Sequence, residues 1–208
     1  MKLKVYLKAY LTTALLCMFA FTAVAQHDHG QKPAAAAPAM DPAMMEAMMK
    51  LGSPSDAHKK LDGMVGSWDT KVSFWMMPGM DASTSTGTST NQWIMGGRYL
   101  EQRFKGDMGG MPFEGIGYTG YDNIKKQYWG TWMDSMSTGM MTSTGSASSD
   151  GKTWDFTATM SDPMTGKDST AKEKVTVIDA DHHTMEMWVA GPDGKMFKNL
   201  EIHYTRKK

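Results

Sequence analysis

The sequence predicts a mainly β protein, an antiparallel up-and-down β-barrel of about ten strands preceded by a short helical segment. The chain contains many short segments in which apolar and polar residues alternate. In one of them, Trp154 and Phe156 alternate with Thr153 and Asp155. Turn-forming pairs such as Asp193-Gly194 separate these segments. Closing these strands into a barrel removes both free sheet edges, which favours a barrel over a sandwich.

The N-terminus has the order of a cleavable secretory signal. Lys2, Lys4 and Lys8 come before an apolar run over residues 9–24, which ends in a small-residue cleavage site at Ala25. A membrane anchor is the weaker interpretation, because a span needs roughly 20 residues and no second apolar run follows. We therefore expect an exported protein, periplasmic or extracellular, without a membrane span after cleavage.

The next segment predicts a tether and then a helix. Residues 26–42 combine Ala, Pro and charged residues without apolar periodicity, which is typical of a flexible segment. Asp41 is a suitable N-cap for a helix with Pro42 at its first position. Methionines at helical spacing form an apolar stripe along this helix, and residues 55–61 can form a second short helix.

The remainder of the chain predicts the strands. We expect them at about residues 68–76, 87–95, 98–105, 113–121, 127–134, 139–146, 153–160, 169–178, 184–189 and 196–205. The chain therefore divides into a signal peptide (1–25), a tether (26–42), a helical segment (43–61) and a β-barrel domain (62–208).

One strand carries the strongest signs of a binding site. Tyr128, Trp132 and Asp134 share a face, and Gly130 on that face leaves room for a ligand. If this face points inward, aromatic rings and a carboxylate would meet an interior ligand; the alternative is that the charges face solvent and the aromatic rings form the core. The predicted ligand-binding residues are Trp93, Arg98, Tyr128, Trp132, Asp134, Glu186, Trp188 and Glu201.

The first and last strands predict a structural contact. Gly66 and Trp68 open the first strand and Arg206 closes the last, and these two strands become neighbours in a meander barrel. Arg206 can then cover the indole of Trp68 in a cation–π contact. These residues are expected to close one end of the barrel.

Several motifs together resemble a known family. They are Val65-Gly66-Ser67-Trp68, Met95-Gly96-Gly97-Arg98-Tyr99-Leu100, Pro112-Phe113-Glu114-Gly115-Ile116-Gly117, Gly120-Tyr121-Asp122-Asn123, Thr131-Trp132-Met133-Asp134 and Glu201-Ile202-His203-Tyr204-Thr205-Arg206. The chain resembles the bacterial family of domain of unknown function 1579, which is grouped with the lipocalin-like calycin barrels. The resemblance implies a barrel, no established activity and no catalytic residues.

Methionine is unusually frequent, at 23 of 208 residues. The thioether suits Cu(I), so His27, His29, Met44 and Met48 are candidate metal ligands for copper handling. The alternative, which we favour, is that methionine fills irregular gaps in packing.

Haem is a second cofactor hypothesis. A ten-strand barrel with a Gly-x-Trp motif also resembles the nitrobindin type, which holds haem through a barrel histidine. His203 lies on the last strand, but the alternate face with Leu200, Ile202 and Tyr204 is the better interior face. An exposed His203 is therefore expected, and we predict no cofactor.

Charge and motifs exclude other functions. After removal of the signal, 19 Lys and Arg stand against 22 Asp and Glu without a basic run, which argues against nucleic acid as a partner. The mature chain has no cysteine and no nucleophile or phosphate-binding motif, so we expect no enzyme. The sequence predicts an exported barrel that binds a small, largely apolar molecule, with two alternatives: periplasmic copper handling, or a structural or stress-related envelope protein whose packed barrel holds nothing.

Overall fold

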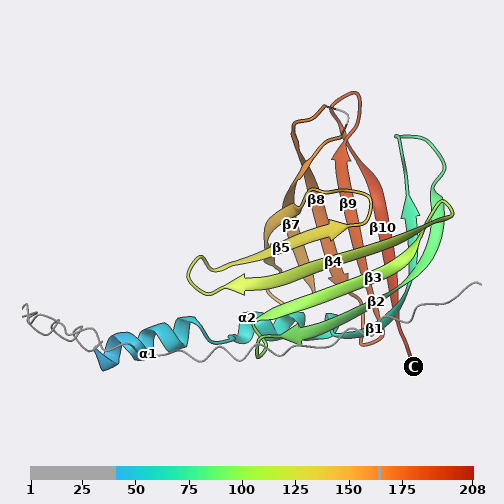
Figure 1. The fold of residues 1–208 in the computed structure, drawn as a ribbon. Coiled ribbons are helices and arrows are strands. Elements are labelled where there is room, and N and C mark those ends of the chain that lie inside the picture. Colours follow the sequence, from blue (N-terminus) through green and yellow to red (C-terminus); the bar gives the residue numbers. More distant parts are fainter. Residues whose placement is uncertain (1–40, 164) are drawn as a thin grey trace, which may run out of the picture. The chain divides into compact units, whose positions relative to one another are not determined.

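Ten antiparallel strands form a closed barrel in the computed structural model, which describes residues 41–163 and 165–208 (Figure 1). Each strand pairs with its neighbours in the sequence, and β1 pairs with β10, which confirms the predicted up-and-down barrel. The strands are β1 (Gly66–Phe74), β2 (Ser83–Ile94), β3 (Tyr99–Met108), β4 (Met111–Asp122), β5 (Gln127–Asp134), β6 (Met141–Ala147), β7 (Thr153–Ser161), β8 (Asp168–Val177), β9 (His182–Ala190) and β10 (Met196–Arg206).

In the part of the chain that the structure describes, three short helices precede the barrel. They are α1 (Pro42–Leu51), α2 (Asp56–Lys59) and the 3-10 helix η1 (Lys60–Met64). The prediction of one helix over residues 55–61 is wrong at the C-terminal end of that helix. The α-helix changes there to a 3-10 helix, which begins at Lys60 and ends at Met64. No helix in the described residues is long and apolar enough to cross a membrane. The predicted signal peptide and nearly all of the predicted tether lie outside the described residues.

Helix α1 begins where the sequence predicts. Asp41 Oδ1 accepts a hydrogen bond from the backbone N–H of Ala43 at 2.9 Å, as an N-cap does. The methionine stripe is nevertheless exposed, and the helix buries none of its residues. Asn123 and Arg98 hold only its C-terminal end, since they donate to the carbonyls of Leu51 and Gly52 at 2.8 Å each.

The hairpin turns place the connections alternately at two ends of the barrel. Gly151, Gly166 and Gly194 have φ values of 66°, 67° and 76°, the left-handed conformation that these turns require. We call the end with η1 and the chain's C-terminus the closed end. The other end, formed by residues 75–82, 109–110, 135–140, 162–163, 165–167 and 191–195, is the open end.

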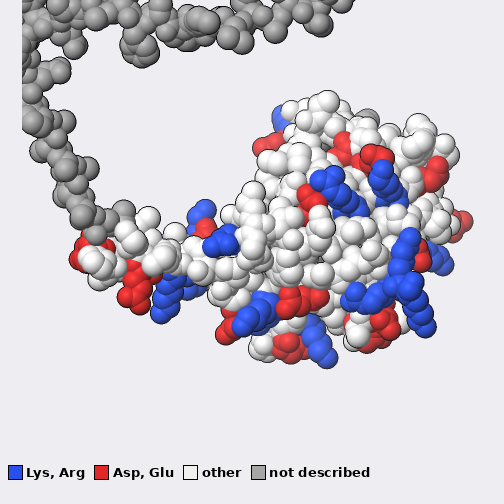
Figure 2. Space-filling view, turned by 60° about the horizontal axis from the view of Figure 1, so that its bottom comes forward, with Lys and Arg blue, Asp and Glu red and all other residues white. Residues whose placement is uncertain are grey.

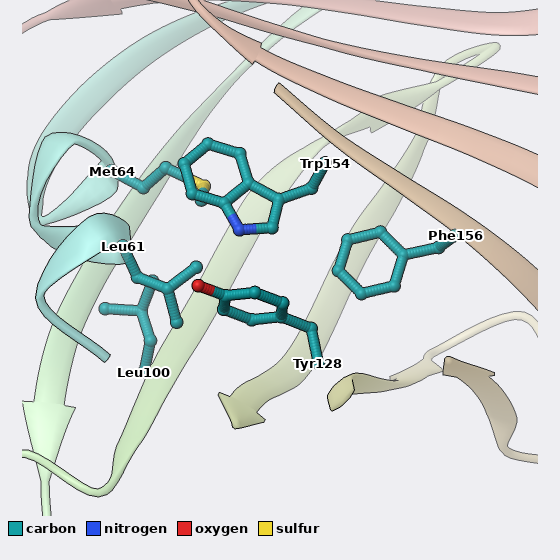
Figure 3. Close-up of a cluster of buried hydrophobic side chains, with 6 residues drawn as sticks. All are labelled: Leu61, Met64, Leu100, Tyr128, Trp154 and Phe156. Carbon is teal, nitrogen blue, oxygen red and sulfur yellow. The ribbon is translucent and has the colours of Figure 1, made fainter. Parts of the chain in front are cut away.

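The closed end is plugged by η1. Leu61 and Met64 of η1 pack against Trp154 and Tyr128 from the barrel wall, with Leu100 and Phe156 completing the cluster (Figure 3). Tyr128 Oη also donates to the carbonyl of Ala57 at 2.7 Å, and Trp68 Nε1 donates to the carbonyl of Met64 at 3.0 Å. These bonds hold the plug against the strands, because they pair polar groups that are buried or partly buried.

Strand closure completes this end. Trp68 pairs with Arg206 in the β1–β10 register, and the guanidinium carbon of Arg206 lies 4.1 Å from the indole centroid, the predicted cation–π contact. Arg206 Nη1 also donates to the carbonyl of Val65 at 2.8 Å. A Cβ at Gly66, where φ is 135°, would collide with this guanidinium, so glycine is required for both its conformation and its space.

Candidate functional site

Between the plug and the open end, the barrel holds a cavity of about 740 Å³. This volume is in the range of sites for small organic ligands. Its wall comes from the inward faces of the strands and includes Val72, Phe104 and Ile202. Residues 136–140 of the β5–β6 connection also line it, so the cavity reaches the open end.

Methionine contributes much of the cavity wall. Met185 and Met187 project from β9, and Met160 from β7. Further methionines line the cavity near the open end: Met108, Met136, Met140 and Met141. Because the methionine side chain is flexible and polarisable, this wall can adjust to ligands of different shape.

Trp132 forms a flat part of the wall. Its ring lies over Gly115 and Gly117 of β4, and a Cβ at Gly115 would overlap the indole. Trp132 Nε1 donates to Asp134 Oδ2 at 2.9 Å, while Asp134 Oδ1 accepts from the backbone N–H of Met136 at 3.0 Å. The two β4 glycines therefore make room for an indole whose edge is held by a carboxylate.

A polar group lies across the inner part of the cavity. Gln102 Nε2 donates to Ser89 Oγ at 3.1 Å and to Tyr204 Oη at 3.3 Å. Complete burial raises the pKa of Tyr204 to about 12, so its phenol stays protonated. His183 stacks on Tyr204 with ring centroids 4.1 Å apart. Burial, with a smaller effect of the Arg206 charge, lowers the pKa of His183 to about 3 and keeps its imidazole neutral.

Glu173 is the carboxylate buried in the cavity wall. It lies on β8 between Phe156 of β7 and Met187 of β9 in the strand register, and its side chain is 7% exposed. Burial raises the pKa of Glu173 to about 7, although a hydrogen bond from Ser143 acts in the opposite direction. A carboxyl group here is therefore poised between its neutral and charged forms at neutral pH.

Of the predicted ligand-binding residues, Trp132 and Asp134 line the cavity and six do not. Trp93 and Tyr128 lie in the barrel wall at the closed end and contact the plug, where Trp93 Nε1 donates to Asp62 Oδ1 at 2.8 Å. Arg98 lies in the β2–β3 turn at the closed end and donates to the carbonyls of Gly52 and Met95. The prediction that these three side chains surround an interior ligand is corrected accordingly.

The other three predicted residues lie on the outer wall. Lys198 Nζ lies 3.1 Å from Glu186 Oε1 and 2.6 Å from Glu201 Oε2, and Trp188 pairs with Lys198 in the register. The side chains of the three predicted residues face outward. Successive side chains of a strand alternate between the two faces, and Ile202, beside Glu201 on β10, lines the cavity. A β-bulge between Lys198 and Leu200 shifts the register at this point.

Glu173 and Gln102 were not predicted as cavity residues, whereas Tyr204 was predicted on the interior face of the last strand and does line the cavity. A signal was present for Glu173, because it is the one charged residue in an otherwise apolar or small set of alternate positions, Ser169, Ala171, Glu173, Val175 and Val177. Glutamate at such a position in a barrel strand points inward with its neighbours.

The cofactor hypotheses find no assembled site in the described residues. Met44 and Met48 are exposed on α1, and His27 and His29 lie outside the described part of the chain. Among the described residues, no group of three or more His, Cys, Asp or Glu could hold a metal ion. His203 lies on the outer wall with Nε2 2.9 Å from Glu201 Oε1, rather than inside the barrel.

Comparisons with known proteins agree with this architecture. The family model described as "Protein of unknown function (DUF1579)" matches residues 53–206. The crystal structure of Rv2717c from M. tuberculosis is similar with a TM-score of 0.55 and 12% identity, covering 75% of this chain and 100% of that chain. The S-type phycobiliprotein lyase CPES from Guillardia theta has a TM-score of 0.50 and 11% identity, covering 77% and 97%. These likenesses show the fold alone, and none of the curated proteins matches the chain.

Proposed function

Since the chain belongs to the family described as "Protein of unknown function (DUF1579)", we propose its function from the barrel itself. The protein is an exported carrier or sensor that holds a small, largely apolar molecule inside the barrel. The observation that carries this proposal is the cavity of about 740 Å³ with its wall of aromatic, aliphatic and methionine side chains. Apolar molecules gain free energy on entering such a site because they leave water.

The cavity favours ligand binding over two alternatives. A structural barrel filled by its own side chains would leave no space of this size, so the cavity argues against a packed interior. Catalysis by a cysteine nucleophile or a histidine base is also less favoured, because none of the described lining residues is a histidine or a cysteine. Export is supported by the signal-like order of charged, apolar and small residues that ends at Ala25.

The first test uses tryptophan fluorescence of the mature protein titrated with N-phenyl-1-naphthylamine, a neutral apolar probe. Energy transfer from Trp132 to a probe in the cavity is expected because Trp132 lines the wall. Trp132→Phe should remove a large part of this transfer, whereas Trp188→Phe, an outer-wall control, should change it less. Equal transfer in the wild type and in Trp132→Phe would overturn binding at this cavity.

Native mass spectrometry of the protein purified from its own host gives a second test. A bound organic mass that is lost on denaturation would support the proposed function. A copper adduct would support metal handling by the methionines instead. Absence of probe binding together with a bare polypeptide mass would contradict the proposal.

A further inference from the structure

The charges of the cavity wall have one sign. Asp134 and Glu173 are its two acidic residues, and none of the described lining residues is Lys, Arg or His. His183 of β9 stacks on Tyr204, and burial lowers its pKa to about 3, so its imidazole is neutral. A ligand anion would thus meet carboxylates and no cation.

Glu173 is placed to meet a ligand from within the wall. Its neighbours in the strand register are the apolar Phe156 and Met187, and its hydrogen-bond partner is the neutral hydroxyl of Ser143. The other titratable groups of the cavity, Asp134 and Tyr204, also provide no positive charge. A buried carboxylate without a counter-ion costs free energy, which a cationic ligand would recover.

The entrance has the same sign as the cavity. The connections of the open end and the strand residues beside them carry the acidic residues Asp81, Asp107, Asp134, Asp162, Asp168 and Asp193 against the basic residues Lys167 and Lys195. In the view that brings the bottom of Figure 1 forward, the barrel surface carries Lys and Arg side chains among Asp and Glu (Figure 2). A negative entrance raises the local concentration of cations and their rate of association.

The uncharged part of the wall also suits a cation with an apolar body. The indole of Trp132 attracts a positive charge over its face, and its N–H is already bonded to Asp134. Thioethers such as Met185 and Met187 accommodate alkyl or ring carbons of varied shape.

We infer that the cavity ligand is an apolar organic cation, such as an alkyl or aryl amine, whose positive group pairs with Glu173 while its carbon skeleton lies along Trp132 and the methionines. This inference rests on the proposed function and names its ligand class. It excludes fatty acids and other apolar anions as preferred ligands, because the wall offers them no cation.

The test is displacement of bound N-phenyl-1-naphthylamine from the mature protein at pH 8 by decylamine, decanol or decanoate. The three competitors share one alkyl chain and differ in charge. Decylamine should displace the probe at a concentration roughly tenfold or more below that of decanol, since a hydrogen bond to a charged group contributes at least this factor. Decanoate should be the weakest competitor.

Two variants locate the effect. Glu173→Gln is nearly isosteric and should abolish the amine preference while decanol competes as before. Glu114→Gln, on an exposed carboxylate paired with Lys105 on the outside, should keep the preference. Equal displacement by decylamine and decanol, or an amine preference retained in Glu173→Gln, would overturn the inference and leave the proposed function standing. Loss of probe binding itself would instead overturn the proposed function and the inference together.

Discussion

The two ends of this barrel are built from different side chains for different purposes. At the closed end Trp68, Leu61 and Trp154 have no exposed surface, and hydrogen bonds tie η1 to the strands. At the open end Met76 and Met140 are 70% and 53% exposed, and short connections surround a cavity. Buried packing is thus concentrated at one end, which leaves the other free to contact a ligand.

The largest expected effect comes from removing a side chain of the closed end. Trp154→Ala should lower the free energy of unfolding by about 3–5 kcal/mol, because it leaves a cavity in a fully buried cluster. Met140→Ala at the open end should change it by less than about 0.5 kcal/mol. Urea unfolding followed by far-ultraviolet circular dichroism measures both.

The same pair of variants tests the division of roles. Equal losses of stability in Trp154→Ala and Met140→Ala would show that the open end is as tightly packed as the closed end. Different losses would locate the stabilising core at η1 and the strands around it.

The second prediction concerns pH and the cavity carboxylate. The folded pKa of Glu173, about 7, exceeds its unfolded value of 4.5, so the folded state binds this proton more tightly. The contribution of Glu173 to the free energy of unfolding is therefore fully present below pH 4.5 and is lost as pH rises through 7. This is a change of about 3 kcal/mol. Glu173→Gln should be more stable than the wild type at pH 8 and lose most of that advantage at pH 4.5.

Chemical unfolding of the two proteins across this pH range provides the measurement. The difference between variant and wild type isolates Glu173, because other carboxylates titrate equally in both. The exposed variant Glu114→Gln should follow the wild type at every pH. A constant difference between Glu173→Gln and the wild type would mean that this carboxyl group is not desolvated in the fold.

The sequence predicted the strands better than the faces they present. Local signals define a strand, and the turn predicted at Asp193-Gly194 forms, with Gly194 at a φ of 76°. The inward face depends on register, which a one-residue slip reverses. Trp132 and Asp134 line the cavity, as predicted, whereas Glu186 and Glu201 face outward. For Glu201 the apolar alternation of Leu200, Ile202 and Tyr204 already indicated the outward face, but the charged residue was weighed without it.

The third prediction, with a smaller effect on stability than Trp154→Ala, tests how the cavity wall is shaped. Gly115→Ala places a methyl group where the Trp132 ring now lies, so the indole must turn into the cavity. Overpacking of this kind should cost about 1–2 kcal/mol of stability, but the displaced ring should reduce binding of N-phenyl-1-naphthylamine much more than the stability change suggests. Probe titration and urea unfolding of the same preparation separate the two effects.

Gly139→Ala is the matched control for this variant. Gly139 also lines the cavity, but a Cβ there meets only Ser137 Oγ at 3.4 Å, an ordinary contact, so binding and stability should both stay near the wild-type values. If Gly115→Ala binds the probe as the wild type does, the probe does not occupy the space beside Trp132. If both alanine variants lose probe binding, even an added methyl group that meets no close neighbour disturbs the cavity. The open end would then be more tightly packed than its exposed methionines suggest, and the contrast between the two ends of the barrel would weaken.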